Sequence, residues 1–305
     1  MPSATHAVRG GHANAHWEAV AAVPCPALTG LVHGYAGFRE RSTAAVQRRE
    51  LPSAEVVLVV NLEAGLTVSR GPGRVAAPAA FVTGVGHSSV TTSHAGWHAA
   101  LEVRIPAPAA KAVLGAPGIA LAEQVVDLGD LWGTAAAELV EQLTGQNWDR
   151  CFRVLESVLL ARAARAGPAD LHPPLVYAHD LLLAHEGDLP MRDLLEATGW
   201  SRRRLAGQFN EHAGMTPKAL ARLVRFRHAE RLLRAPGHRS VASIALTCGY
   251  CDQAHLNRDF RELAGCSPTA YLVQLRGDTS GTGMATAHDS DHETQTYKTE
   301  DPSRS

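Results

Sequence analysis

The spacing of hydrophobic positions along the chain changes near residue 106. Before it, β-branched runs alternate with Gly and Pro, which predicts short strands over 56–62, 66–69, 81–85 and 99–105. After it, apolar residues recur every three or four positions, which predicts helices over 107–114, 131–143 and 150–166. We therefore expect a small, mostly antiparallel sheet or barrel followed by helices. Residues 1–50 show little periodicity apart from the run 31–38, and no defined element is predicted there.

An internal repeat near the C-terminus is the strongest pattern in the sequence. The segment 194–200 corresponds to 244–250 at an offset of 50, and four further positions correspond at an offset of 51: Leu205, Phe209, Gly214 and Pro217 pair with Leu256, Phe260, Gly265 and Pro268. Each copy reads as a short helix, a turn at Gly followed by an aromatic residue, a second helix, and a third helix that opens at Pro. The repeat thus predicts two helix-turn-helix motifs.

Local capping signals support these boundaries. Ser201 and Asp252 are expected to cap the second helix of each motif, and Thr216 and Ser267 to cap helices that begin at proline. The helix between the motifs is expected over 217–235, roughly 28 Å at 1.5 Å per residue. This length approaches the repeat of B-DNA, about 34 Å, so one chain could set two helices into successive major-groove segments.

The distribution of charge singles out the same region. Residues 190–276 contain 14 Lys and Arg against 7 Asp and Glu, whereas the whole chain has a net charge of -1. All but one of those cations are arginine, whose planar guanidinium group can donate two parallel hydrogen bonds to a phosphate or to the edge of a guanine. If the paired apolar residues point inward, the following residues are left on more exposed faces of the second helices: Arg202, Arg203, Ala206, Gly207, Asn210, Gln253, Ala254, Asn257 and Arg258.

The second motif resembles the signature of the AraC/XylS family of bacterial transcription regulators. The similarity covers GYCDQAHLNRDF at 249–260 and GCSPTAY at 265–271, and the related region is about the last third of the chain. The resemblance implies contacts with DNA bases from Arg203, Ala206, Gly207 and Asn210 in the first motif, and from Gln253, His255, Asn257 and Arg258 in the second. The family often has an arginine where this chain has Gly207, so we expect the second helix to discriminate bases more strongly.

The N-terminal part resembles regulatory domains attached to such DNA-binding modules in actinobacterial relatives, through 108–118 and 125–133. The fold class expected is α+β: a β-rich regulatory, effector or dimerisation domain over 1–170, β-rich to about 105 and then helical, and an all-α DNA-binding domain over 171–276 with its two motifs joined by a long helix. The tail 277–305 is polar and is expected to be disordered.

Composition narrows the class of protein further. The chain has 305 residues, of which 45% are hydrophobic and 19% charged, a balance typical of globular proteins. It contains no long apolar run and no signal-like start, so we expect a cytoplasmic protein without membrane association. The five cysteines are widely spaced, which suits a reducing compartment.

Other functional patterns are weaker. His87, His94 and His98 lie near predicted strands, and His98 would share a strand face with Glu102, but the spacing typical of cupin metal sites is absent. Cys248 is expected to pack within the second motif, which argues against a redox or zinc role for its CxxC. We predict no metal, no cofactor and no catalytic residues.

Two function classes remain. The favoured class is a DNA-binding transcription regulator whose partner is double-stranded promoter or operator DNA. RNA polymerase, an unknown small-molecule effector and a second copy of the chain are further candidate partners. The alternative is an enzyme or DNA-repair protein that uses the module for targeting, with Cys25 or Cys151 as its reactive thiol.

Overall fold

The N-terminal half is built from two antiparallel β-sheets. The computed structural model describes residues 3–12, 15–63, 65–69, 75–167, 170, 172–237 and 239–277. The larger sheet has the strand order β1-β2-β3-β10-β5-β8-β11, and the smaller one has the order β4-β9-β6-β7. The strands are β1 (Ser3–His12), β2 (Ala15–Val23), β3 (Gly34–Ser42), β4 (Val46–Glu50), β5 (Glu55–Asn61), β6 (Thr67–Ser69), β7 (Val75–Ala76), β8 (Ala80–Thr83), β9 (Val90–His94), β10 (Trp97–Pro106) and β11 (Val125–Asp127). The pairings between these strands are antiparallel, as expected.

The central strand β10 is buried on both faces. It pairs with β3 on one side and with β5 on the other. Because successive side chains of a strand point to opposite faces, Leu101, Val103 and Ile105 join the main hydrophobic core, whereas Ala100 joins a smaller apolar cluster on the other side. Strand β10 therefore lies between the main hydrophobic core on one face and the smaller apolar cluster on the other.

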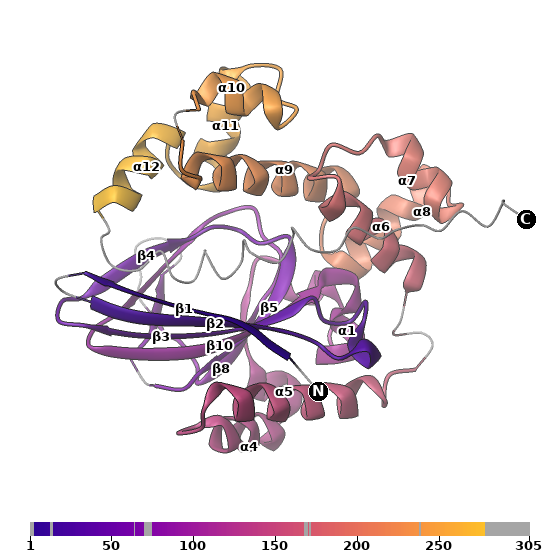
Figure 1. The fold of residues 1–305 in the computed structure, drawn as a ribbon. Helices are drawn as coiled ribbons and strands as arrows, with labels where there is room; N and C mark the ends of the chain where they lie inside the picture. The colour runs from indigo at the N-terminus through magenta and orange to yellow at the C-terminus, as the bar shows by residue number, and fades with distance from the viewer. Residues whose placement is uncertain are drawn as a thin grey trace, which may run out of the picture.

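Helices follow the sheet as the periodicity predicts. They are η1 (Pro26–Leu28), η2 (Ala107–Ala109), α1 (Ala110–Leu114), α2 (Gly118–Leu121), α3 (Leu128–Trp132), α4 (Thr134–Leu143) and α5 (Trp148–Ala163). The helix expected over 131–143 is interrupted at Gly133, whose φ is 60°. Figure 1 shows α4 and α5 along one side of the sheets, opposite the C-terminal helices.

The C-terminal part is helical throughout its described length. It comprises α6 (Pro173–Ala184), α7 (Met191–Thr198), α8 (Arg202–Gln208), the π-helical turn η4 (Phe209–Ala213), α9 (Pro217–Arg234), α10 (Val241–Thr247), α11 (Gln253–Leu263) and α12 (Pro268–Gly277). Helix α9 lies between the α7–α8 pair and the α10–α11 pair (Figure 1). Within the described residues, none of the helices combines the length and apolar character that a membrane span requires. The tail expected to be disordered lies, from residue 278 onward, outside the described residues.

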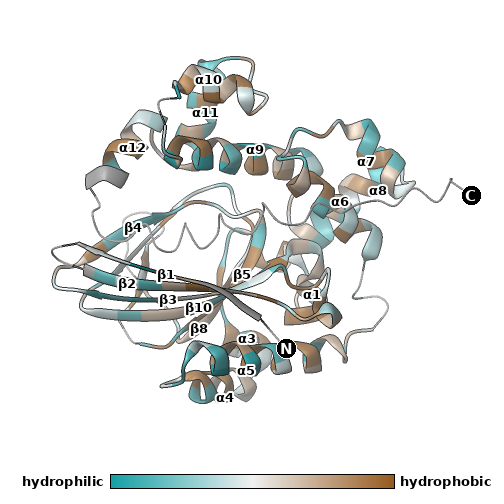
Figure 2. Cartoon of the chain, in the orientation of Figure 1, coloured by the Kyte–Doolittle hydropathy of each residue, from teal (hydrophilic) through white to brown (hydrophobic). Residues whose placement is uncertain are grey.

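One hydrophobic core joins the two halves of the chain. It extends from Val20 and Leu58 in the sheet, through Phe152 of α5, to Phe226 of α9 and Phe260 of α11. Figure 2 shows hydrophobic and hydrophilic positions interleaved along α9, as expected for a helix that packs on several neighbours. The β-rich part is consequently in direct contact with the helical part.

The expectation for residues 1–50 is wrong, because β1 to β4 lie there. Alanine, glycine and histidine dominate this segment, and these residues carry weak intrinsic strand preference. The strands form because β2 and β3 pair with each other and β3 pairs with β10. Strand formation here depends on tertiary partners.

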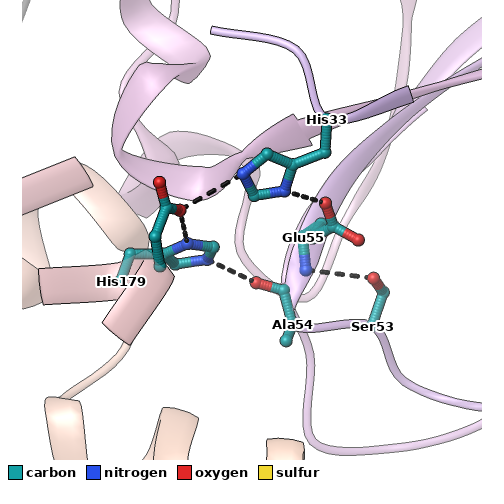
Figure 3. A network of polar contacts seen from close by, with 6 residues as sticks. His33, Ser53, Ala54, Glu55 and His179 are labelled. Carbon is teal, nitrogen blue, oxygen red and sulfur yellow. Dashed lines mark hydrogen bonds and ion pairs between the residues drawn. The ribbon is translucent and has the colours of Figure 1, made fainter. Parts of the chain in front are cut away.

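A polar network connects the sheet to α6 (Figure 3). Nδ1 of His33 lies 2.6 Å from Oε1 of Glu55, and its Nε2 lies 3.2 Å from Oδ1 of Asp180 on α6. Nε2 of the neighbouring His179 lies 3.2 Å from the carbonyl oxygen of Ala54. Since both ring nitrogens of His33 face carboxylates, both must carry a proton, and the ring is a cation.

The network shifts the titration of its members. Burial alone lowers the pKa of His33, but hydrogen bonds to Asp180 and Glu55 outweigh burial and raise this pKa to about 9. Burial raises the pKa of Asp180, yet hydrogen bonds from His179 and His33 bring it down to about 2. The pKa of Glu55 is likewise lowered, because His33 and Arg104 outweigh its burial.

These shifts predict a loss of stability at alkaline pH. The pKa of His33 is raised above the ordinary value of 6.5, so its contribution is complete below pH 6.5 and is lost as the pH rises through about 9. We expect His33→Gln to lower the free energy of unfolding by about 2 kcal/mol at about pH 6 and by much less at about pH 9.5. Urea denaturation at both pH values measures this, with His185→Gln at the exposed end of α6 as the control. A difference between wild type and His33→Gln that does not change with pH would contradict the ion-pair role.

Candidate nucleic-acid interface

The first helix-turn-helix motif consists of α7 and α8. Helix α7 ends at Gly199, whose φ of 64° places it in the left-handed region that glycine adopts most easily. Ser201 then caps α8, and its side chain accepts a hydrogen bond from the backbone N–H of Arg204 at 3.3 Å. The turn and the cap are therefore as the sequence predicts.

The second motif, α10 and α11, repeats this geometry. Gly249 has a φ of 72°, and Asp252 caps α11 by accepting a hydrogen bond from the backbone N–H of His255 at 2.7 Å. Thr216 caps α9, and Ser267 caps α12, each through a side-chain bond of 3.2 Å. The second motif has one more residue than the first between its turn glycine, Gly249, and its helix cap, which explains the change of offset from 50 to 51. The second helices of the two motifs therefore begin at equivalent positions of the repeat.

Apolar side chains hold the second helix of each motif in place. Leu205, Phe209, Leu256 and Phe260 are all completely buried, as the repeat predicts. The ring of Phe260 meets that of Phe226 on α9 edge to face, with centroids 4.8 Å apart. The opposite faces of α8 and α11 are consequently the ones turned away from the core.

The structure places most of the predicted base-facing residues of the first motif at the surface. Arg202, Arg203 and Gly207 are exposed on α8, and Asn210 is exposed in the π-helical turn that follows. Ala206 is half-buried. Beside this surface, the guanidinium of Arg204 stacks over the ring of Trp200 at 4.7 Å.

The second motif presents a denser set of polar groups. Gln253 and Arg258 are exposed, and His255 and Asn257 are half-buried on the same helix. The ring of His255 stands perpendicular to that of the buried Tyr250, with centroids 5.0 Å apart. This contact fixes the orientation of an imidazole at the start of α11.

Ion pairs separate the structural arginines from the exposed ones. Arg222 on α9 donates to Asp259 at 3.0 Å and to Glu262 at 2.7 Å, and this raises its pKa. In contrast, within the part of the chain that the structure describes, no carboxylate pairs with Arg202, Arg203 or Arg258. These three side chains are therefore available to an external anion.

Sequence reasoning missed the polar contacts that orient the second motif. Glu230 of α9 is 1% exposed and accepts a hydrogen bond of 2.6 Å from the hydroxyl of Tyr271 on α12. Arg227 and Arg234 also pair with Glu230, at the i−3 and i+4 positions of the same helix. That spacing was visible in the sequence, whereas the partnership with Tyr271 was not, because α12 is distant along the chain.

The N-terminal half contacts both motifs at equivalent positions of the repeat. In the first motif, Gly118 of α2 packs so closely on η4 that a Cβ atom there would lie 2.3 Å from the carbonyl oxygen of His212. In the second, the guanidinium of Arg49 on β4 donates to the carbonyl oxygen of Ala264 at 2.5 Å. Ser89 donates to the same oxygen at 3.3 Å. The β-rich half thus touches the end of each second helix.

The cysteines do not form a reactive site. Burial raises the pKa of both Cys151 and Cys248 to about 11, which keeps these thiols protonated near neutral pH. Cys248 is buried within the second motif as expected, while Cys251 is exposed. Cys25 is half-buried, and its backbone N–H donates to the carboxylate of Glu156 at 2.8 Å.

The histidines noted in the sequence separate into two environments. His94 and His98 stack with their ring centroids 4.7 Å apart, whereas His87 is exposed and its backbone N–H donates to Glu123. Among the described residues, no three His, Cys, Asp or Glu side chains converge as a metal site requires.

Comparison with known proteins finds similarity in the C-terminal region. The family model described as a helix-turn-helix domain matches residues 194–274. An uncharacterized HTH-type transcriptional regulator of Haemophilus influenzae is 32% identical over 91 residues, which are 30% of this chain and 30% of the relative. The matched segment therefore spans less than a third of the length of this curated relative.

Two solved structures each align with about a third of the chain. A transcriptional regulator from Chromobacterium violaceum, with an AraC-type DNA-binding domain, is 28% identical and covers 33% of this chain and 91% of its own, with a TM-score of 0.32. The DNA-binding domain of AdpA, in complex with a target DNA, is also 28% identical and covers 35% and 98%, with a TM-score of 0.33. Residues 194–274 of the chain thus match a helix-turn-helix domain.

Proposed function

We propose that the chain is a sequence-specific transcription regulator that sets α8 and α11 into successive major-groove segments of one DNA duplex. The observation that carries this proposal is the repetition of one capped motif on either side of α9, with unpaired cationic side chains on the outer faces. Helix α9 has 18 residues, about 27 Å of helix at 1.5 Å per residue. This spacing fits two contacts separated by about one turn of B-DNA.

The two helices divide the recognition of DNA unequally in this proposal. On α11, Gln253, His255, Asn257 and Arg258 offer amide, imidazole and guanidinium groups, which can bond base edges in the major groove. On α8, Ala206 and Gly207 leave the centre of the exposed face without a long donor. Arg202 and Arg203 supply phosphate contacts there, and Asn210 lies beyond the centre of the helix.

The remaining parts of the chain receive the following roles. Residues 171–276 form the DNA-binding domain, and residues 1–170 form a regulatory domain that contacts both motifs through Gly118 and Arg49. Such a domain adjusts DNA affinity by binding a small molecule, a second copy of the chain or RNA polymerase. A cytoplasmic location follows from this function. The alternative of an enzyme targeted to DNA is weakened, because burial raises the pKa of the Cys151 thiol to about 11.

The unequal division predicts unequal effects of two arginine substitutions. Arg258→Ala should cost about 1 to 3 kcal/mol on the preferred sequence and relax the preference at one or two adjacent base pairs, because a bidentate guanine contact is lost. Arg203→Ala should weaken binding more uniformly and lower the salt slope by about one unit. Selection of sites from a random DNA pool with both variants measures this, with Arg153→Ala on the distant helix α5 as the control. A larger loss of sequence preference in Arg203→Ala would reverse the assignment.

Gly207 offers a gain-of-function test of the first helix. A Cβ atom built there meets no other atom within 4 Å, so a side chain fits without rearrangement. Gly207→Arg should bind DNA more tightly than wild type and steepen the salt dependence by about one unit, since it adds a cation to the DNA-facing surface. Gly207→Ala is the matched control, because it shares the helix stabilisation of about 1 kcal/mol that follows from removing glycine. Equal DNA affinity of Gly207→Arg and Gly207→Ala, measured by fluorescence anisotropy, would show that this face of α8 does not meet DNA.

A further inference from the structure

A cavity of about 400 Å³ lies between the two β-sheets and reaches the C-terminal helices. Strands β5, β8 and β10 of the larger sheet and β4, β6 and β9 of the smaller sheet contribute to its wall. Residues of α6, α9 and α12 complete the lining, including Val224 and Arg227 of α9. Its volume is within the range of cavities that hold small organic molecules, about 300 to 1,000 Å³.

The inner wall of the cavity is apolar. It is formed by the smaller hydrophobic cluster, whose members come from the larger sheet and from the loop before β6: Val57, Val59, Leu66, Phe81 and Ala100. These side chains are nearly inaccessible to solvent, yet they face a cavity and not the main core. Such a wall favours the hydrocarbon part of a ligand, because transfer of apolar surface out of water is favourable.

His98 is the polar group that this wall leaves unsatisfied. Its side chain lines the cavity beside Ala100 and is 2% exposed. Among the described residues, neither Nδ1 nor Nε2 of His98 has a hydrogen-bond partner. Burial, together with the neighbouring His94 and Arg48, lowers the pKa of His98 to about 4, so the ring is neutral near pH 7.

A neutral imidazole restricts the chemistry of its partner. It presents one N–H donor and one lone-pair acceptor. A hydroxyl group can serve either nitrogen, since it both donates and accepts. Leaving both nitrogens buried and unpaired is unfavourable, and a ligand that bonds one of them removes part of this penalty.

Charges around the cavity disfavour an ionic ligand. The carboxylate of Glu102 lines the same cavity, four residues from His98 on the same face of β10, and repels an anion placed at the imidazole. The guanidinium of Arg48 also lines the cavity near His98 and repels a cation placed there. The arginines of α9 that reach the cavity are already paired: Arg231 with Glu186, and Arg227 and Arg234 with Glu230. An anionic head group would have to break these ion pairs.

We propose that this cavity binds an uncharged amphipathic small molecule whose apolar body packs on Val59, Phe81 and Ala100 and whose hydroxyl group hydrogen-bonds to His98. The bound molecule also contacts α9, the helix that joins the two motifs. Its effect on DNA affinity rests on the proposed function, whereas the binding itself does not. By thermodynamic linkage, if the ligand changes the affinity of the protein for DNA by a given factor, DNA changes the affinity of the protein for the ligand by the same factor.

The experiment uses the intact chain without DNA and three probes that share one apolar body. These are para-isopropylbenzyl alcohol, para-isopropylbenzoate and para-isopropylbenzylamine, with thymol as a second neutral hydroxyl probe. Isothermal titration at neutral pH should show saturable binding of the alcohol and of thymol to one site. The acid and the amine should bind about tenfold more weakly or not at all, since each places a charge beside His98.

Variants of His98 test the hydrogen bond. His98→Leu should weaken binding of the alcohol about tenfold, about 1.4 kcal/mol, and His98→Asn should restore most of it, because the amide keeps a donor and an acceptor. His98 makes no hydrogen bond within the described structure, so His98→Leu should keep or raise the melting temperature. His16→Leu, an exposed histidine on β2, is the matched control and should bind as wild type.

Three outcomes would overturn the proposal. They are the absence of binding of both hydroxyl probes, tighter binding of the acid or the amine than of the alcohol, and unchanged affinity in His98→Leu. Because these titrations contain no DNA, they remain interpretable if the protein fails to bind DNA. Conversely, if the protein binds DNA but neither hydroxyl probe, the proposed function still stands and only the proposal of a ligand in the cavity is refuted.

Discussion

The packing of α9 against its neighbours is the constraint on which the C-terminal half depends. Phe226 is completely buried against Phe260 of α11, and Glu230 accepts hydrogen bonds or ion pairs from Tyr271, Arg227 and Arg234. A buried carboxylate is tolerated only when such partners replace its hydration. Because Tyr271 belongs to α12, these contacts join the end of the second motif to the helix that also leads to the first.

The arginines of the C-terminal half have two different roles. Arg222, Arg231 and Arg234 are held by carboxylates and serve the fold. Arg203 and Arg258 have no such partner within the described residues and remain at the surface of α8 and α11. The number of cations in the segment therefore overstates how many of them can meet DNA, since paired cations release few counterions from a nucleic acid.

The β-rich half is arranged to influence both motifs together. Arg49 bonds to the end of α11, and Gly118 packs against the turn that ends α8, so a shift of the sheets relative to α9 would act on both helices. The His33 network anchors α6 to the start of β5. The cavity lies between these contacts, because Arg49 and Glu55 both contribute to its lining. Arg49 thus belongs both to the lining of the cavity and to the contact with the second motif.

Sequence alone determined the elements whose information is local. The caps at Ser201 and Asp252, the glycine turns and the inward pairs such as Leu205 with Phe209 involve residues within one or two helical turns, so spacing was sufficient to predict them and the family resemblance. Only tertiary structure decided the strands before residue 50, where β3 pairs with β10 and β4 pairs with β9, and the isolation of His98. The sequence placed His98 and Glu102 on one strand face, but whether that face meets a core, a metal or a cavity depends on the opposite sheet and on α9, more than a hundred residues away.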